Sequence, residues 1–110
     1  MIVYALSTCD TCRKALKELR AAGHDPEVVD VRKDGVPAEV LEAMLDEFGE
    51  ALVNRRSTTW RGLSEAERAG DPATLLGAHS TLMKRPVIRN GDAWFLGWDA
   101  NVRAALVETG

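Results

Sequence analysis

Two cysteines near the start of the chain are the residues best suited to chemistry. Residues 7–19 read STCDTCRKALKEL, and Cys9 and Cys12 are the only cysteines in the sequence. A pair with this spacing can form a disulfide, bind a metal, or act as a nucleophile with a helper thiol. The reactive form is the thiolate, and an ordinary cysteine is mostly protonated at neutral pH. The elements around the pair therefore decide which chemistry is available.

The residues on either side of the pair predict a strand followed by a helix. Met1 to Leu6 is a short apolar run typical of a buried strand. After it, small or apolar residues recur at a spacing of three and four, which gives a helix one buried face. These residues are Cys12, Ala15, Leu16 and Leu19. The motif thus lies where a strand passes into a helix.

This position predicts different roles for the two thiols. Cys9 precedes the helix, where unpaired backbone N–H groups and the positive end of the helix dipole stabilise an anion. Cys12 lies one turn further on and points towards the buried face. Arg13 and Lys14 add positive charge nearby. We therefore interpret Cys9 as the nucleophile and Cys12 as the resolving thiol, as in a thioredoxin-type redox site.

A zinc site is the competing interpretation of the pair. It needs two further ligands, and the only histidines are His24 and His79. They match no usual zinc-finger spacing, so we predict no metal site. His79 falls on an apolar helical face and is predicted to be structural. His24 falls in a turn and is predicted to face solvent.

The remaining pattern predicts one α/β domain over residues 1–110. After a second strand at 27–31, we expect a helix at 37–48, a polar loop at 54–61, a short helix after Ser64 and a helix from Asp71 to Met83. A hairpin at 85–97 turns at Asn90-Gly91, and a helix at 100–107 follows Asp99. The order βαβ, helical insert (about 37–83), ββα is that of a thioredoxin-like sandwich with a mixed sheet.

A second site signal lies at the start of the predicted hairpin. In a thioredoxin-like fold, Pro86 would lie against the active-site cysteine, in either the cis or the trans form. Arg85, with Arg55, Arg56 and Arg61, can gather positive charge that holds an oxyanion or a glutathione carboxylate. The alternative is that these arginines are solvated surface residues. The candidate residues for substrate or anion binding are Thr8, Arg13, Arg56 and Pro86.

The bulk composition favours a cytoplasmic protein that binds neither nucleic acid nor a membrane. The formal net charge is −3 at pH 7, which argues against a polyanionic partner. The apolar runs are far shorter than the roughly 20 residues of a membrane span. In the cytosol thiols are mostly reduced, so a lone cysteine pair favours catalysis or redox sensing over a structural disulfide.

Three separated segments carry a family resemblance over nearly the whole chain. CDTCRKA, LVNRRSTTWRGL and LMKRPVIRNGDAWFLGWD resemble the arsenate reductase ArsC/Spx family, especially its small YffB-like branch. The resemblance implies a thioredoxin-like fold with a helical insert and a cis peptide at Pro86. It also implies that Arg85 acts beside the catalytic thiol and that Cys9 is the nucleophile.

The branches of this family imply different activities. Arsenate-reducing members surround the oxyanion with three arginines, of which Arg85 matches one; Asn54 stands where the second is expected and Gly97-Trp98-Asp99 where the third is expected. Spx-like members are redox-switched regulators that bind the RNA polymerase α subunit, and Cys9 and Cys12 match their switch. YffB-like members resemble glutathione-dependent thiol reductases and match the TTWR loop best.

We therefore predict a small thiol-disulfide oxidoreductase. It would have no bound cofactor and would be reduced by glutathione or by thioredoxin or glutaredoxin. The Spx-like regulator is the alternative, and arsenate reduction ranks below both.

Overall fold

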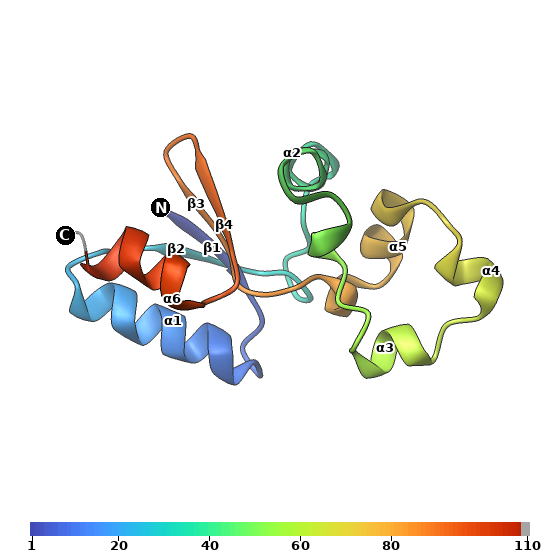
Figure 1. The fold of residues 1–110 in the computed structure, drawn as a ribbon, viewed down its shortest axis with the longest axis horizontal. Helices are drawn as coiled ribbons and strands as arrows, with labels where there is room; N and C mark the ends of the chain where they lie inside the picture. Colours follow the sequence, from blue (N-terminus) through green and yellow to red (C-terminus); the bar gives the residue numbers. More distant parts are fainter. Residues whose placement is uncertain (109–110) are drawn as a thin grey trace. The chain divides into compact units, whose positions relative to one another are not determined.

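The computed structural model describes residues 1–108, and the chain divides into two compact units (Figure 1). Unit 1 contains Met1–Asp30 together with the chain from Arg85 onward. Unit 2 contains Val31–Lys84, which includes the predicted helical insert at 37–83. That the two units form one domain stays a prediction, and its last two residues lie outside the described part.

Unit 1 is built on a four-stranded mixed sheet. Its elements are β1 (Ile2–Ala5), α1 (Asp10–Ala21), β2 (Glu27–Asp30), β3 (Val87–Asn90), β4 (Ala93–Leu96), α6 (Ala100–Arg103) and the π-helical turn η3 (Ala104–Glu108). The strand order is β2-β1-β3-β4. β1 pairs parallel with β2 and antiparallel with β3, and β3 and β4 form a hairpin. The predicted βαβ unit and hairpin are therefore both confirmed.

The two faces of this sheet carry different side chains, because successive residues of a strand point to opposite sides. Val3, Ala5 and Ile88 share the face that packs against the two helices, where they form one core with Cys12, Leu19, Val102 and Leu106. α1 and α6 lie on the same side of the sheet (Figure 1). On the other face, the ring of Tyr4 stacks on that of Trp94, with centroids 6.3 Å apart. Phe95, the next residue along β4, packs against the helix-side core.

Unit 2 is made of short helices. They are α2 (Ala38–Phe48), η1 (Gly49–Leu52), α3 (Thr58–Arg61), α4 (Glu65–Arg68), α5 (Pro72–Ala78) and η2 (Ser80–Leu82). Leu52 and Leu82 are fully buried. The residues that follow them, Val53 and Met83, form an isolated antiparallel bridge. Backbone bonds from Asn54 N–H to the Leu82 carbonyl (2.7 Å) and from Lys84 N–H to the Leu52 carbonyl (2.8 Å) flank the bridge.

Several predicted boundaries in unit 2 were wrong. The segment 54–61 is not a loop throughout: Ser57 caps the one-turn helix α3, because its side chain accepts the Trp60 N–H. The helix expected to reach Met83 ends at Ala78, because His79 leaves the helical conformation. A separate 3₁₀ turn follows it. Sequence periodicity continues across such a break, since both segments bury leucines on one side.

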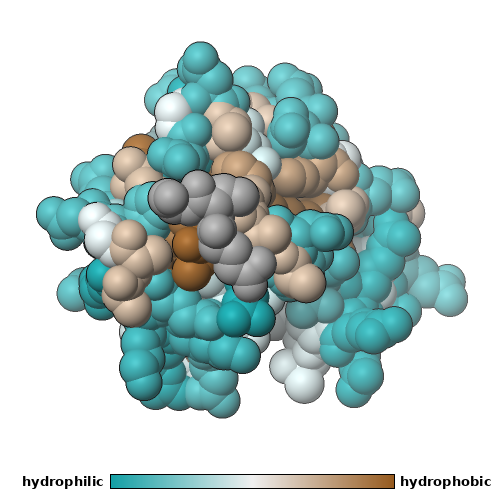
Figure 2. Space-filling model, turned by 60° about the vertical axis from the view of Figure 1, so that its left-hand side comes forward, coloured by the Kyte–Doolittle hydropathy of each residue, from teal (hydrophilic) through white to brown (hydrophobic). Residues whose placement is uncertain are grey.

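The face drawn in Figure 2 is predominantly hydrophilic. On the face drawn in Figure 2, hydrophobic residues gather near the centre and hydrophilic ones surround them. Within residues 1–108, no helix has the length and apolar character required to cross a membrane.

Candidate active site

Cys9 lies at the beginning of α1, where the strand-to-helix turn exposes it in part. It is the N-cap residue, with extended backbone angles (φ −87°, ψ 117°). Its backbone N–H donates to the Leu6 carbonyl at 3.0 Å, which closes the turn after β1. Its Sγ atom accepts the backbone N–H of Cys12 at 3.4 Å. The sulfur thus takes the place of the Ser, Thr or Asp oxygen that usually caps a helix.

The surroundings of Cys9 lower the pKa of its thiol below the ordinary value. Partial burial raises this pKa, but hydrogen bonds from the backbone and side chain of Cys12, together with the charge and hydrogen bond of the Arg85 guanidinium, outweigh it. A free cysteine of pKa about 8.5 is only a few per cent thiolate at pH 7. A lowered pKa therefore increases the nucleophilic fraction at neutral pH.

Cys12 differs sharply from Cys9. It is fully buried in the core beneath α1. Burial raises the pKa of its thiol to about 12; a backbone hydrogen bond from Leu6 opposes this rise, the neighbouring Cys9 adds to it, and the charge of Arg85 makes a smaller opposing contribution. Two of the effects that raise the pKa of Cys12 come from Cys9: a side-chain hydrogen bond and the charge of its thiolate. They weaken when Cys9 enters a mixed disulfide, because the thiolate charge is then gone.

Arg85 and Pro86 lie at the start of β3, beside the cysteine pair. The Arg85 guanidinium interacts with both thiols. The Arg85–Pro86 peptide bond is cis, as the resemblance implied. Pro86 is fully buried, and its carbonyl accepts the Gly97 N–H at 2.8 Å. This bond ties the entry of the hairpin to its exit.

The other candidate binding residues have different surroundings. Thr8 is exposed in the turn just before Cys9. Arg13 is exposed and forms an ion pair with Asp10 one turn earlier, so it is not among the groups that set the Cys9 pKa. Arg56 belongs to unit 2, and its backbone N–H donates to the Asn54 side chain at 3.1 Å. Unit 1 thus brings Arg85 together with Cys9 and Cys12, and Pro86 follows Arg85 in the chain. Substrate or anion binding by Thr8, Arg13, Arg56 and Pro86 stays a prediction.

Sequence reasoning missed Leu6, whose carbonyl and backbone hydrogen bond hold the two cysteines in place. It also missed Asp10, which neutralises Arg13. An acid in the first helical turn followed three residues later by an arginine is a readable signal for such a pair.

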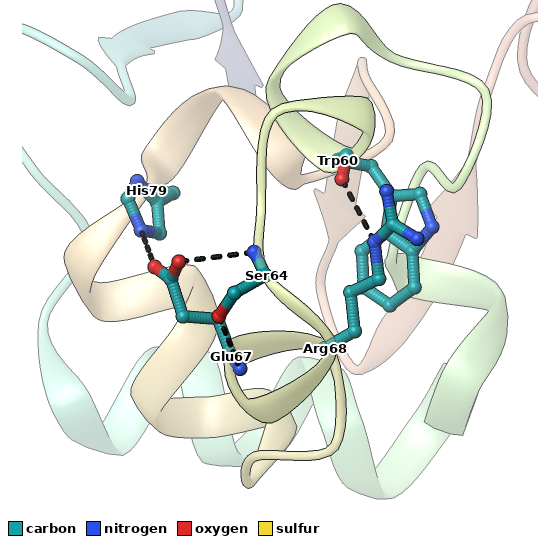
Figure 3. A network of polar contacts seen from close by, with 5 residues as sticks. All are labelled: Trp60, Ser64, Glu67, Arg68 and His79. Carbon is teal, nitrogen blue, oxygen red and sulfur yellow. Dashed lines mark hydrogen bonds and ion pairs between the residues drawn. The ribbon is translucent and has the colours of Figure 1, made fainter.

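The two histidines have structural contacts, one of which contradicts its prediction. His24 is not simply solvated: its Nε2 lies 2.7 Å from the Leu106 carbonyl and links the turn after α1 to the end of the chain. His79 approaches Glu67 at 3.8 Å, and Glu67 completes a capping box with Ser64 (Figure 3). Residues 1–108 contain no cluster of three or more potential metal ligands.

The fold and this site define a class: an α/β protein with a thioredoxin-like mixed sheet and a CxxC motif at the start of its first helix. The model of the ArsC family matches residues 4–105, so the chain belongs to the ArsC family. An uncharacterized protein from Haemophilus influenzae is 37% identical over 102 residues, which cover 88% of this chain and 90% of that one.

Solved structures agree with this assignment. A protein named YffB superimposes with a TM-score of 0.87 at 29% identity, covering 96% of this chain and 97% of its own. An arsenate reductase (ArsC) related protein from Brucella melitensis gives 0.72 at 33% identity, covering 94% and 91%. The predicted fold and family are confirmed.

Proposed function

We propose that the protein is a thiol-disulfide oxidoreductase in which Cys9 is the nucleophile. The supporting observation is the partly exposed Cys9 sulfur at the N-terminus of α1, where the Cys12 N–H and the Arg85 guanidinium favour its thiolate. The proposal includes a cytoplasmic location, where glutathione or a thioredoxin- or glutaredoxin-type protein supplies electrons.

The first half of the reaction is a thiol-disulfide exchange. The Cys9 thiolate attacks one sulfur of the substrate disulfide, so a new S–S bond forms as the old one breaks. The other substrate sulfur leaves as a thiolate and takes a proton from solvent. In this scheme the Arg85 guanidinium stabilises negative charge on the sulfurs during the exchange.

The second half releases the bound substrate. Either Cys12 loses its proton and attacks Cys9 Sγ, or a glutathione thiolate attacks Cys9 Sγ; in both routes the bond to the substrate sulfur breaks, and that sulfur takes a proton from solvent. In the glutathione route, a second glutathione thiolate then attacks the glutathione sulfur bound to Cys9, which frees the Cys9 thiol and forms oxidised glutathione. In the first route the protein ends with a Cys9–Cys12 disulfide, and the substrate has gained two electrons and two protons. Two glutathione molecules, oxidised to their disulfide, restore the dithiol. Burial of Cys12 slows the internal route, because its attack requires a thiolate in the core.

A matched pair of variants tests the proposal. The assay follows reduction of the mixed disulfide of glutathione and 2-mercaptoethanol, coupled through glutathione reductase to NADPH. Cys9→Ser should lower the rate to the uncatalysed background, whereas Cys12→Ser should keep activity if glutathione resolves the intermediate. Full activity of Cys9→Ser would overturn the proposal.

Intact mass in a graded glutathione buffer separates the two resolving routes. An internal disulfide would assign resolution to Cys12, and a stable glutathione adduct on Cys9 would assign it to glutathione. Arsenate reduction is tested by supplying arsenate as the substrate in the NADPH-coupled assay.

A further inference from the structure

Beside the cysteine pair, unit 1 contains a groove whose lining, apart from Cys12, takes no part in the proposed chemistry. It has a volume of about 400 Å³ and lies between α1 and β2. The groove is lined by Ala5, Leu6, Ser7, Cys12, Arg13, Leu16, Arg20, Val28 and Asp30. This volume lies in the range of sites that accept an apolar group.

The groove has an apolar centre and cationic ends. Leu16 from α1 faces Val28 from β2, and the Val28 side chain is 42% exposed. Arg13 and Arg20 lie on the same helical stripe as Leu16, seven residues apart and hence about 10 Å along the helix axis. A group that fills the groove thus has an arginine at each end; Arg13 is already paired with Asp10, and the acidic Asp30 also lines the groove, so Arg20 is the main cationic group there.

The positive charge extends beyond the groove along the exposed face of α1. The helix has four basic residues (Arg13, Lys14, Lys17 and Arg20) and two acidic ones, a net charge of +2 in a chain of net charge −3. Both acids are engaged: Asp10 pairs with Arg13, and Glu18 accepts bonds from Trp98 and Arg103. In residues 1–108, Lys17 and Arg20 form no ion pair.

We propose that this groove and the cationic face of α1 dock an acidic segment of a protein substrate or protein reductant, with one large apolar side chain seated between Leu16 and Val28. The proposal rests on the proposed function, because α1 begins at Cys9 and a segment docked along it presents its own sulfur there. A second copy of this chain docked through the same face is a poor occupant, since two cationic faces would repel each other.

The spacing defines a peptide probe. Cys9 and Leu16 are seven residues apart, about 10 Å along the helix, which three residues of an extended peptide span. The probe carries a cysteine, as its glutathione mixed disulfide, three residues from a leucine flanked by glutamates. A second peptide has glutamines in place of the glutamates, and a third has serine in place of the leucine.

Two measurements use these peptides. The first is kcat/KM for reduction of each peptide by the wild-type protein at low and high salt. The second is binding to the Cys9→Ser variant, by fluorescence anisotropy, of peptides whose cysteine is replaced by serine. The binding measurement involves no redox step, so a failed reductase function and a failed docking surface are distinguishable.

We expect the glutamate peptide to bind and react roughly three- to tenfold better than the glutamine peptide at low salt, with the preference lost at high salt. Arg20→Glu should abolish the preference, whereas Lys33→Glu, an equal change of charge outside the groove, should keep it. Val28→Thr should reduce the preference for leucine over serine.

Equal binding of the glutamate and glutamine peptides would overturn the proposal, as would equal effects of Arg20→Glu and Lys33→Glu. An oligonucleotide that binds as tightly as the glutamate peptide and competes with it would also overturn it, because the face would then attract any polyanion.

Discussion

The contacts inside unit 1 differ in sequence separation from the contacts inside unit 2. In unit 1, β1 pairs with β3 across more than eighty residues of sequence, and Glu18 reaches Trp98 and Arg103. In unit 2, the helix caps join residues within one turn, as in the Ser64–Glu67 capping box, and the Asn54–Leu82 and Lys84–Leu52 bonds span only about thirty residues. The lesson is that the reactive site belongs to the unit built from distant segments, because only such pairing brings Arg85 beside Cys9.

Truncation of the unit 1 core tests the long-range side of this comparison. Leu19 is fully buried among residues of α1, the sheet and α6. Leu19→Ala should lower the free energy of unfolding by about 2–5 kcal/mol, from lost apolar contact and the remaining cavity. Urea unfolding measures the change. Leu16→Ala, at a half-buried position on the same helix, should cost clearly less; an equal loss would contradict the assignment of Leu19 to the core.

Removal of the guanidinium beside Cys9 tests the contact that joins the two segments of unit 1. Arg85→Met should raise the pKa of Cys9, because a charge and a hydrogen bond that favour the thiolate are lost. A rise of one unit would lower the rate of alkylation at pH 6 about tenfold. The pH profile of iodoacetamide alkylation, read by intact mass, measures this. Arg89→Met, which alters the Arg89–Trp94 contact instead, serves as the control; identical profiles for both variants would refute the role of Arg85.

The buried Cys12 thiol makes the free energy of unfolding depend on pH in the alkaline range. Its folded-state pKa is raised to about 12, so the folded protein keeps a proton that the unfolded chain loses above about pH 8.5. This contribution is complete below the unfolded pKa and is lost as pH rises towards the folded one, with a slope of at most about 1.4 kcal/mol per pH unit. Urea unfolding between pH 7.5 and 10 should therefore show a steeper fall for wild type than for Cys12→Ala. Parallel curves would show that Cys12 is not the group responsible.

Removal of a local cap in unit 2 should have the smallest effect. Ser64→Ala deletes the hydroxyl that accepts the Glu67 N–H at 3.1 Å. The cost should be about 1 kcal/mol, typical of a lost N-cap. Thermal unfolding measures it, and Ser64→Asp should recover most of the loss because a carboxylate can also cap the helix. If Ser64→Ala lowered the free energy of unfolding as much as Leu19→Ala, the proposed difference between local contacts in unit 2 and long-range contacts in unit 1 would be wrong.

Local signals in the sequence were sufficient for much of the molecule. Apolar periodicity predicted α1 and α2, Asn90-Gly91 predicted the β3–β4 hairpin, and Ser64 predicted the start of the short helix α4. Periodicity failed at His79, where it continued across the break between α5 and η2. It also failed to show that Ser57 starts a helical turn, because a one-turn helix has no repeat from which to read a period.

The sequence by itself determined the chemistry available to this protein: two thiols at a strand-to-helix turn, and their family. The tertiary structure decided how the thiols differ. Burial raises the pKa of Cys12, while Arg85 and the Cys12 N–H lower that of Cys9. The place of Cys9 at the helix start and of Cys12 on the buried face could be read from the local pattern. The proximity of Arg85, more than seventy residues further along the chain, could not, because it depends on the pairing of distant strands.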